Sequence, residues 1–412
     1  MTVKTRCIGA ASLAVALASL PPVSLCSQNG GCAATRSLVV LTGQELAPLR
    51  GAPIDQVSLY RASDAGLTPI PFQIDRKDDE GRYLIDGPAT RMHSHAEPVL
   101  DGNDELVLRA SDAAARRNGT AFGVGSAPLV EIALPGRSGW VYVSLSGAPK
   151  DAQNTGPMAY DAASDQVTGP AYRVRFDPQL PFLVDAFQWR RGDGVGWSPD
   201  MTDKMKIRHQ GRFLGLFPFQ RTQGDYVSRL TGVKAGPLRI IRRTENHIRM
   251  LWTLQSPAVY VDYLMMPRGF VMNTIIDIPF RVGLFFSDVE TLTTVDWNDA
   301  PELPALTVRA PDSREGLVVN GRMSAEKSAF NRVQASEFEV ASPLGRMRVD
   351  LELPPGAPIT PWLYLRDARD EPDPPEEEIG QFGNVGFRTT GWEQVEPEVQ
   401  RVRFIVCLEP GR

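Results

Sequence analysis

The stretch from Pro237 to Phe280 constrains the fold of this chain most strongly. It contains four apolar-rich runs, at Pro237 to Arg243, His247 to Leu254, Ala258 to Met266 and Phe270 to Phe280. Gly, Pro and Asn separate these runs, as they separate the strands of an antiparallel sheet. Because no long amphipathic helix pattern accompanies them, the stretch predicts four consecutive antiparallel strands.

Strand-like alternation continues on both sides of this stretch. Tyr172 to Phe176 alternates strictly between polar and apolar residues, and Lys204 to Phe219 is amphipathic with the same period. Further runs occupy Arg346 to Leu353 and Val399 to Cys407. Strands of this number and length predict a large antiparallel β-sandwich, of the supersandwich kind, over residues 171–412.

A smaller β domain is predicted over residues 37–148, ahead of the sandwich. Short strand-like runs recur there, and Leu129 to Leu134 and Trp140 to Leu145 flank a turn as the strands of a hairpin do. Residues 149–170 are polar, rich in Gly and Pro, and unpatterned, which predicts a linker. The predicted architecture is therefore all-β, with a small β-barrel-like domain followed by the sandwich.

Residues 1–34 predict a secretory signal peptide. Two basic residues, Lys4 and Arg6, precede the apolar run Cys7 to Leu20, which is too short to span a bilayer. Cleavage is expected between about residues 26 and 34, and export would place the protein in the periplasm or outside the cell. Leu25 is too large to precede a lipidated residue, which argues against a lipid anchor at Cys26. No later run is apolar enough for a transmembrane helix, so no span is expected in the mature chain.

The cleavage site decides the cysteine content of the exported protein. Cleavage near Cys26 would leave Cys32 and Cys407, which an oxidising compartment can join in a disulfide that closes a very long loop. Cleavage after Ala34 would leave Cys407 alone, as a small buried apolar residue. Both alternatives stay open at this point.

The segment from Phe72 to Asp112 holds the densest set of oxygen ligands. Asp101, Asn103 and Asp104 surround a glycine, which is how calcium loops gather hard ligands, although the spacing of an EF-hand is missing. Asp and Asn also brace turns by accepting hydrogen bonds from backbone N–H groups. A structural Ca²⁺ ion is the cofactor that the sequence suggests, beside this purely structural alternative.

One strand carries candidate catalytic residues. Lys206 and Arg208 share one face of the predicted strand, and His209 lies on the other. A basic strand face in an acidic protein can meet an anionic substrate such as a uronate, with Tyr226 or His209 as the base. Arg229 completes the candidate set. The alternative is a solvated sheet face whose charges pair with local acids.

Aromatic residues near glycine-rich loops suggest a ligand-binding surface. Trp189, Arg190 and Trp197 combine flat rings with a guanidinium group, as sugar-binding surfaces do. In a sandwich, tryptophans also serve as core or rim packing, and that reading stays open. No phosphate loop, nucleophile elbow, zinc-protease motif or Cys-x-x-Cys pair stands out.

Two segments carry a resemblance to known proteins. Val57 to Ile74 and Asp101 to Asp112 resemble a loosely defined group of exported bacterial proteins, in which a strand ending in PFQID precedes an acidic loop and a DxNDELV strand. The arrangement is distantly similar to the small N-terminal β-barrel of exo-rhamnogalacturonan lyase-like proteins, which precedes a sandwich of the galactose-mutarotase type. The resemblance implies this fold and an exported location, and it carries over no catalytic residue.

These observations predict an exported cell-envelope protein that binds carbohydrate or another surface polymer. One alternative is a polysaccharide lyase or hydrolase acting on acidic glycans, and another is a structural subunit of an envelope complex with a protein partner. A nucleic-acid partner is not expected, because the net charge is -5 and nucleic-acid binders normally show a basic face.

Overall fold

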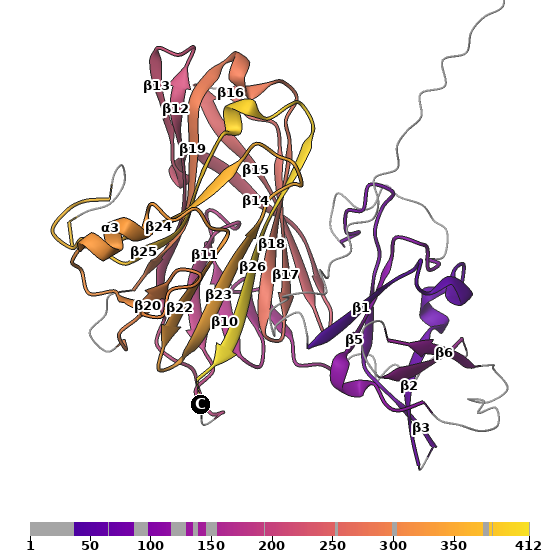
Figure 1. Ribbon diagram of the computed structural model, residues 1–412. Helices are drawn as coiled ribbons and strands as arrows, with labels where there is room; N and C mark the ends of the chain where they lie inside the picture. Colours follow the sequence, from indigo (N-terminus) through magenta and orange to yellow (C-terminus); the bar gives the residue numbers. More distant parts are fainter. Residues whose placement is uncertain are drawn as a thin grey trace, which may run out of the picture.

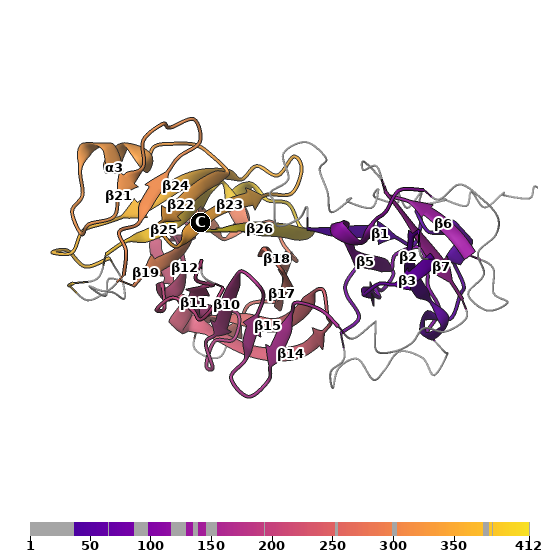
Figure 2. The same cartoon turned by 90° about the horizontal axis from the view of Figure 1, so that it is seen from below.

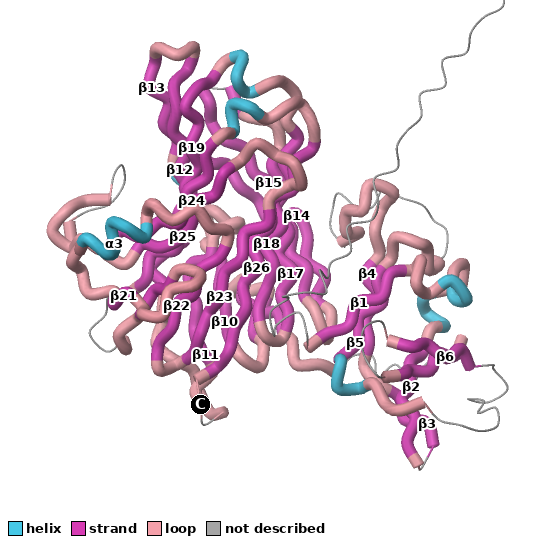
Figure 3. Tube along the Cα trace, viewed as in Figure 1, coloured by secondary structure: helices cyan, strands magenta, loops and turns pink. Residues whose placement is uncertain are grey.

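The protein is built almost entirely from antiparallel strands in the computed structural model, which confirms the all-β prediction (Figure 1 and Figure 3). The only α-helix among the described residues is α3 (Ala325–Phe330). No helix in the described part of the chain has the length and apolar content of a membrane-spanning segment. The structure describes residues 37–64, 66–85, 98–116, 129–134, 139–145, 155–192, 194–251, 254–298, 303–373, 379–380 and 382–411.

The N-terminal part consists of two small sheets, with strand orders β1-β5-β4 and β3-β2-β7-β6. Apolar side chains from both sheets, among them Leu41, Leu59, Ile74, Leu108 and Val141, form one buried cluster. The bounds are β1 Leu38–Thr42, β2 Ser58–Ser63, β3 Gly66–Pro69, β4 Phe72–Asp75, β5 Glu105–Arg109, β6 Leu129–Ala133 and β7 Trp140–Ser144, with short 3₁₀ turns η1 Ala47–Leu49, η2 Ile54–Gln56 and η4 Ala110–Asp112.

One layer of the sandwich is a ten-stranded sheet in the order β14-β15-β17-β18-β26-β23-β22-β20-β21, with β16 paired to β15. The C-terminal strand β26 lies in the middle of this sheet, between β18 and β23 (Figure 2). The bounds are β14 Tyr226–Ala235, β15 Ile240–Leu251, β16 Leu254–Gln255, β17 Val259–Met266, β18 Gly269–Asp277, β20 Thr307–Arg309, β21 Leu317–Val318, β22 Glu337–Ser342, β23 Gly345–Glu352 and β26 Val399–Pro410.

The other layer consists of two sheets, in the orders β11-β10-β9-β8 and β13-β12-β19-β25-β24. The bounds are β8 Ala159–Asp161, β9 Gln166–Thr168, β10 Tyr172–Phe176, β11 Val184–Trp189, β12 Thr202–Phe213, β13 Phe217–Arg221, β19 Phe286–Trp297, β24 Thr360–Arg366 and β25 Asn384–Thr390, with 3₁₀ turns η5 Gln223–Asp225, η6 Val282–Leu284 and η7 Trp392–Gln394.

Part of the predicted linker is folded. Within residues 149–170, β8 and β9 pair with each other, and β9 pairs with β10 as part of the sandwich. Each of these strands has three residues, which is too short for a period of two to be recognised in the sequence. Val167 is fully buried in the main core, so this segment belongs to the domain rather than separating two domains.

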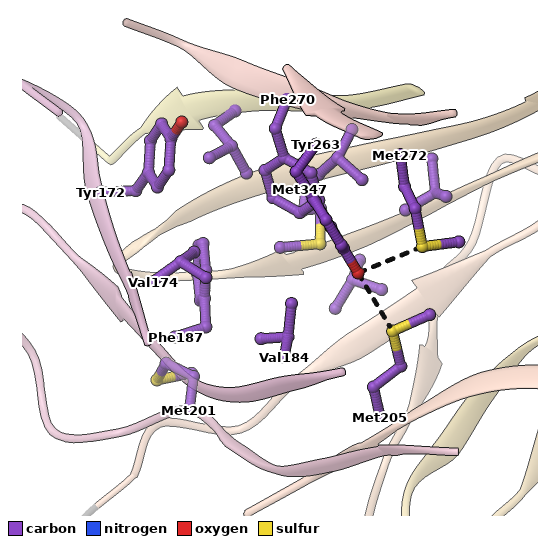
Figure 4. Packing of buried hydrophobic residues seen from close by; sticks show 14 of the residues in the cluster. Tyr172, Val174, Val184, Phe187, Met201, Met205, Tyr263, Phe270, Met272 and Met347 are labelled. Carbon is purple, nitrogen blue, oxygen red and sulfur yellow. Dashed lines mark hydrogen bonds between the residues drawn. The ribbon is translucent and has the colours of Figure 1, made fainter. Parts of the chain in front are cut away.

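The core between the two layers is rich in aromatic and methionine side chains (Figure 4). The Tyr263 hydroxyl lies between the sulfur atoms of Met272 and Met205, at 3.1 and 3.8 Å, and donates to the Phe182 carbonyl at 2.9 Å. Tyr172 donates to the Met266 carbonyl at 2.9 Å. Both of these tyrosine hydroxyls thus have a partner, which avoids the penalty of an unsatisfied polar group in an apolar core.

A buried charge cluster joins the N-terminal part to the outer face of the ten-stranded sheet. The Arg239 guanidinium donates to Asp75 Oδ2 at 2.9 Å and to Glu105 Oε2 at 2.6 Å. Tyr83 donates to the same Glu105 oxygen at 3.0 Å, and Lys234 pairs with Asp75 at 3.0 Å. Arg239, Asp75, Glu105 and Tyr83 are called the Arg239 cluster below.

Gln73 completes this interface through the backbone. Its Oε1 accepts hydrogen bonds from the N–H groups of Leu238 and Arg239, and its Nε2 donates to the Arg239 carbonyl at 2.9 Å. A side chain at Gly236 would collide with Gln73, because a Cβ there would lie 2.0 Å from Gln73 Oε1. Glycine at this position is therefore what lets the two parts approach.

Apolar contacts surround the polar interface. Leu38, Tyr83 and Val107 of the N-terminal part share one buried cluster with Leu238 and Ile241 of the sandwich. The PFQID and NDELV segments noted in the sequence thus supply Gln73, Asp75 and Glu105 to a contact between the two parts of the chain.

Replacing Arg239 by Met should lower the free energy of unfolding by about 3 to 5 kcal/mol, because two buried carboxylates would lose their shared cation. Urea denaturation of purified protein measures this. The matched control is Arg401→Ala, which removes an exposed arginine that donates to the Glu80 carbonyl across the same interface. It should cost less than about 1 kcal/mol, and equal losses in the two variants would contradict the assigned role of Arg239.

Candidate functional site

Charged side chains gather on the side of the five-stranded sheet that faces away from the core. Along β12, Met205 and Phe213 pack with apolar residues, whereas Lys206 and Arg208 point to the opposite side. The register places Lys206 opposite Thr294 of β19, and Asp296 opposite Asn384 of β25. The outer polar face is defined here as Lys206, Arg208, Thr294, Asp296, Trp362, Tyr364, Asn384 and Arg388 with the loop residue Asp373.

Asp373 accepts hydrogen bonds from three residues. Arg208 binds it with two nitrogens at 3.0 and 2.9 Å, Asn384 donates at 2.6 Å, and Tyr364 donates at 3.1 Å. Burial alone would raise the pKa of Asp373, but the Arg208 guanidinium and these hydrogen bonds hold it below the ordinary value. Asp373 is therefore an ionised carboxylate at neutral pH.

Lys206 and Asp296 form a second buried pair, with Nζ 2.8 Å from Oδ2. Burial lowers the pKa of Lys206, and Asp296 restores it only in part. Burial raises the pKa of Asp296, and the Lys206 ammonium opposes this only in part. Both shifts favour the neutral forms, so charge separation in this pair is costly.

Three oxygen atoms next to these pairs are buried without a hydrogen-bond partner. They are Thr294 Oγ1, Asp296 Oδ1 and Asn384 Oδ1. The amide of Asn384 cannot be reversed to change this, because its Nδ2 donates to the Asp373 carboxylate. Buried polar atoms in native proteins are nearly always satisfied by the protein or by ordered water, so three neighbouring acceptors mark a place for a water or another donor.

Partly exposed residues border this buried floor. Trp362 lies on β24 with the Arg388 guanidinium 5.6 Å from its ring centroid, and Arg388 pairs with Glu290 at 3.3 Å. Trp362 Nε1 donates to Thr390 at 3.4 Å, which fixes the ring along the sheet. A flat ring beside polar groups is the combination that binds the apolar face and the hydroxyls of a sugar.

The predicted catalytic residues do not form one site, and this prediction is wrong in its geometry. His209 points toward the sandwich interior, where its Nε2 lies 2.7 Å from the Tyr226 hydroxyl and its Nδ1 lies 2.9 Å from Thr291 Oγ1. Arg229 is exposed on the outer side of the ten-stranded sheet and pairs with Glu245 at 2.9 Å. Neighbouring residues of a strand point to opposite faces, so Lys206 and Arg208 cannot act on a substrate together with His209.

The charges of Lys206 and Arg208 are also neutralised by Asp296 and Asp373. A cationic face for an anionic substrate is therefore not present in this form. The alternative noted from the sequence, pairing with acids, describes these two side chains better, although the acids are buried rather than solvated.

The predicted aromatic surface divides into a buried and a partly exposed part. Trp189 is only 3% exposed and packs edge-on against Phe187, so the expected exposure of this ring is wrong. Trp197 is partly exposed, and the guanidinium carbons of Arg173 and Arg190 lie 4.4 and 4.8 Å from its ring centroid. A ligand on Trp197 would compete with these cation–π contacts.

The predicted calcium loop uses its oxygens for the backbone. Asp101 Oδ1 accepts hydrogen bonds from the N–H groups of Asn103 and Asp104, and Asp104 accepts from Lys77 and Asp101. Within the described ranges, no group of three or more His, Cys, Asp or Glu side chains is arranged to hold a metal ion. Calcium binding at this loop stays a prediction.

The cysteine prediction is also open. Cys407 is buried in β26, opposite Gly269 and Arg348 on the neighbouring strands. Cys32 and the predicted signal peptide lie outside the described residues. The disulfide between Cys32 and Cys407 therefore stays a prediction.

Several residues of the outer polar face had no signal in the sequence. Asp373 belongs to the charged, proline-rich run from Arg366 to Glu378, which predicts a solvated loop, yet Asp373 is buried against Arg208. Thr294 and Asp296 alternate with apolar residues along β19, a pattern that predicts a strand without saying which face is functional. Only the three-dimensional pairing of β12, β19 and β25 brings these residues together.

Comparisons with known proteins add little beyond this geometry. No family model matches the chain, and no curated protein matches it. Among solved structures, an alpha-mannosidase from Enterococcus faecalis V583 has a TM-score of 0.45 at 8% identity, over 89% of this chain and 39% of that chain. A glycosyl hydrolase family 38 protein from Enterococcus faecalis has a TM-score of 0.40 at 9% identity, over 92% of this chain and 39% of that chain.

The chain thus spans 39% of the length of each of these two proteins. TM-scores and identities this low carry no information on activity. The function is therefore inferred from the residues of this chain alone.

His209 should make stability depend on pH in mildly acidic solution. Burial lowers its pKa from 6.5 to about 4, so the unfolded chain binds a proton that the folded protein does not. This contribution to stability is complete above pH 6.5 and is lost as the pH falls toward about 4. The expected loss is about 2 to 3 kcal/mol, after allowance for partial exposure.

Urea denaturation at pH 7 and at pH 4 measures this contribution. In the His209→Gln variant, the loss of stability between pH 7 and pH 4 should be smaller by this contribution. The control His247→Gln makes the same change in β15, and it should lose as much stability between these two pH values as the unchanged protein does. An H209Q variant with the full acid sensitivity would show that His209 is not its source.

Proposed function

We propose that the protein is exported and binds carbohydrate or another surface polymer on the outer polar face. The export half rests on the N-terminal sequence, where a basic start precedes a short apolar run. The binding half rests on the five-stranded sheet, whose outward side carries buried charges and a bordering tryptophan.

The observation that carries this proposal is the set of unpartnered acceptors at Thr294, Asp296 and Asn384. Sugar hydroxyls are donors and would reach such buried acceptors through bridging waters. The buried pairs beside them are expensive in free energy, and a sheet face without a ligand would be more stable with apolar residues there. Keeping charges on this face is therefore consistent with binding rather than with folding alone.

Trp362 supplies the second half of the recognition. It is partly exposed, and its ring is oriented by the hydrogen bond to Thr390 and by Arg388. A pyranose ring placed on Trp362 would direct its hydroxyls toward the polar floor. This arrangement suits a neutral sugar better than a uronate, because the nearby cations already have carboxylate partners.

Replacing Trp362 by Ala should lower binding to glycans on an array at least about tenfold, since central aromatic contacts dominate such interfaces. The matched control is Trp197→Ala on the four-stranded sheet, which should keep the binding of the unchanged protein. If W197A loses binding and W362A keeps it, the ligand lies on Trp197 instead. If the unchanged protein binds no glycan on a broad array, the proposed function is wrong.

Hydrolysis of the bound glycan is a second candidate, favoured by one observation. Asp296 and Asp373 share the outer polar face, and their pKa values are shifted in opposite directions, up for the first and down for the second. Paired carboxylates that titrate apart are typical of an acid and a base in glycoside cleavage.

Cleavage is tested by incubating the protein with each glycan that binds and measuring new reducing ends. Asp296→Asn should abolish product formation even at glycan concentrations that saturate the variant. A lyase acting on uronates would instead form unsaturated products that absorb in the ultraviolet. If neither product forms with any bound glycan, the role of this face is binding alone.

A further inference from the structure

An exposed apolar tip lies at one end of the sandwich, away from the outer polar face. It is formed by two loops, one between β12 and β13 and one around η6 (top of Figure 1). The exposed fractions of its side chains are Leu214 54%, Leu216 75%, Phe217 61%, Phe280 39%, Leu284 65% and Phe285 42%. These six residues are called the apolar tip.

The two loops are joined and supported as one unit. Leu214 donates its N–H to the Phe285 carbonyl at 2.7 Å, and the Phe280 and Phe285 rings are 5.3 Å apart. Below them the Phe286 ring contacts Phe213 at 5.5 Å and Phe219 at 4.9 Å. The exposed side chains are thus presented on a packed aromatic base.

The backbone at the tip is unfavourable for the residue that occupies it. Leu214 and Gly215 both have positive φ, 51° and 71°, and Leu216 donates to the Phe213 carbonyl at 3.2 Å, which closes a type I′ turn. Asn or Asp adopts the first of these positions at lower cost than Leu. Leucine here is therefore unfavourable both in conformation and in exposure to water, which points to a role outside folding.

Arginines lie close to the base of the tip. The side chains of Arg212 and Arg281 are 61% and 57% exposed. Their carboxylate partners, Asp288 and Glu396, are exposed as well, and the Arg212–Asp288 separation is 3.6 Å. Such solvent-exposed pairs contribute little to stability, so either arginine can exchange its partner for a phosphate group.

We infer that the apolar tip inserts into the interface of a phospholipid bilayer, with Arg212 and Arg281 at the depth of the lipid phosphates. The side chains project from two turns, and a bilayer interface accepts such projecting Leu and Phe side chains without a complementary groove. The positive charge of the arginines is attracted to anionic headgroups. The apolar part of an arginine side chain can lie along the buried apolar residues while its guanidinium stays at the polar interface. The protein would therefore dock reversibly on a membrane surface through this end.

The test is cosedimentation with vesicles of phosphatidylethanolamine and phosphatidylglycerol, mixed roughly three to one to supply anionic headgroups. The double variant Leu216→Ser, Phe217→Ser should bind at least about tenfold more weakly than the unchanged chain, because two apolar side chains lose their burial. The control Val318→Ser removes a side chain that is 46% exposed on β21, far from the tip, and should bind normally. All variants share the apolar N-terminal run, so differences between them report on the tip.

Leu214→Asn separates membrane binding from folding. It should keep or raise the melting temperature, because Asn suits the positive φ, and it should still weaken vesicle binding. Vesicle binding by the double variant equal to that of the unchanged chain would overturn the inference. Concentration-dependent self-association lost in the double variant, without vesicle binding, would assign the tip to a contact between two copies and would also overturn it.

Discussion

The buried guanidinium of Arg239 determines how the two parts of the chain are arranged. It binds carboxylates from β4 and β5 at once, while Gln73 binds the backbone on either side of the Leu238–Arg239 peptide. Burying three charges is costly, and the cost is offset only when every partner is in place. Burial would raise the pKa values of Asp75 and Glu105, yet Arg239 holds both below their ordinary values. The N-terminal part is thereby fixed against the ten-stranded sheet (Figure 2).

The outer faces of the ten-stranded and five-stranded sheets differ in how fully their buried polar groups are hydrogen-bonded. On the ten-stranded sheet, the N-terminal part covers the outer face around Arg239, and no atom of the Arg239 cluster is among the buried atoms without a partner. On the five-stranded sheet, buried charges occur together with unpartnered oxygens at Thr294, Asp296 and Asn384. A fully satisfied cluster is explained by folding, whereas a partly satisfied one leaves room for a water or a ligand donor. The contrast within one molecule supports placing the ligand on the second side.

The sequence indicated where the strands lie, but it did not indicate which side of a sheet faces the core and which carries the candidate site. The period of two at Tyr172 to Phe176 predicted β10 correctly, because alternation reports half-buried strands directly. The turn predicted between Arg243 and His247 was wrong, since β15 runs through it. The side-chain amide of Asn246 forms hydrogen bonds with Ser228, Thr244 and the Val259 carbonyl. Its polar atoms therefore have partners within the sheet, and the asparagine does not mark a turn here. The burial of Asp373 was missed because its partner, Arg208, is distant in the sequence. No residue close to Asp373 in the sequence indicates that this carboxylate is buried.

The Lys206–Asp296 pair connects occupancy of the outer polar face to its protonation. Oδ2 of Asp296 is used by Lys206, while Oδ1 has no donor. A carboxylate that accepts more hydrogen bonds is stabilised in its charged form, so a ligand hydroxyl at Oδ1 would lower the pKa of Asp296. The ionised carboxylate would in turn favour the charged ammonium of Lys206, against the effect of burial. Occupancy would therefore favour the ion-paired form of Lys206 and Asp296, and deprotonation of Asp296 and ligand binding would strengthen each other.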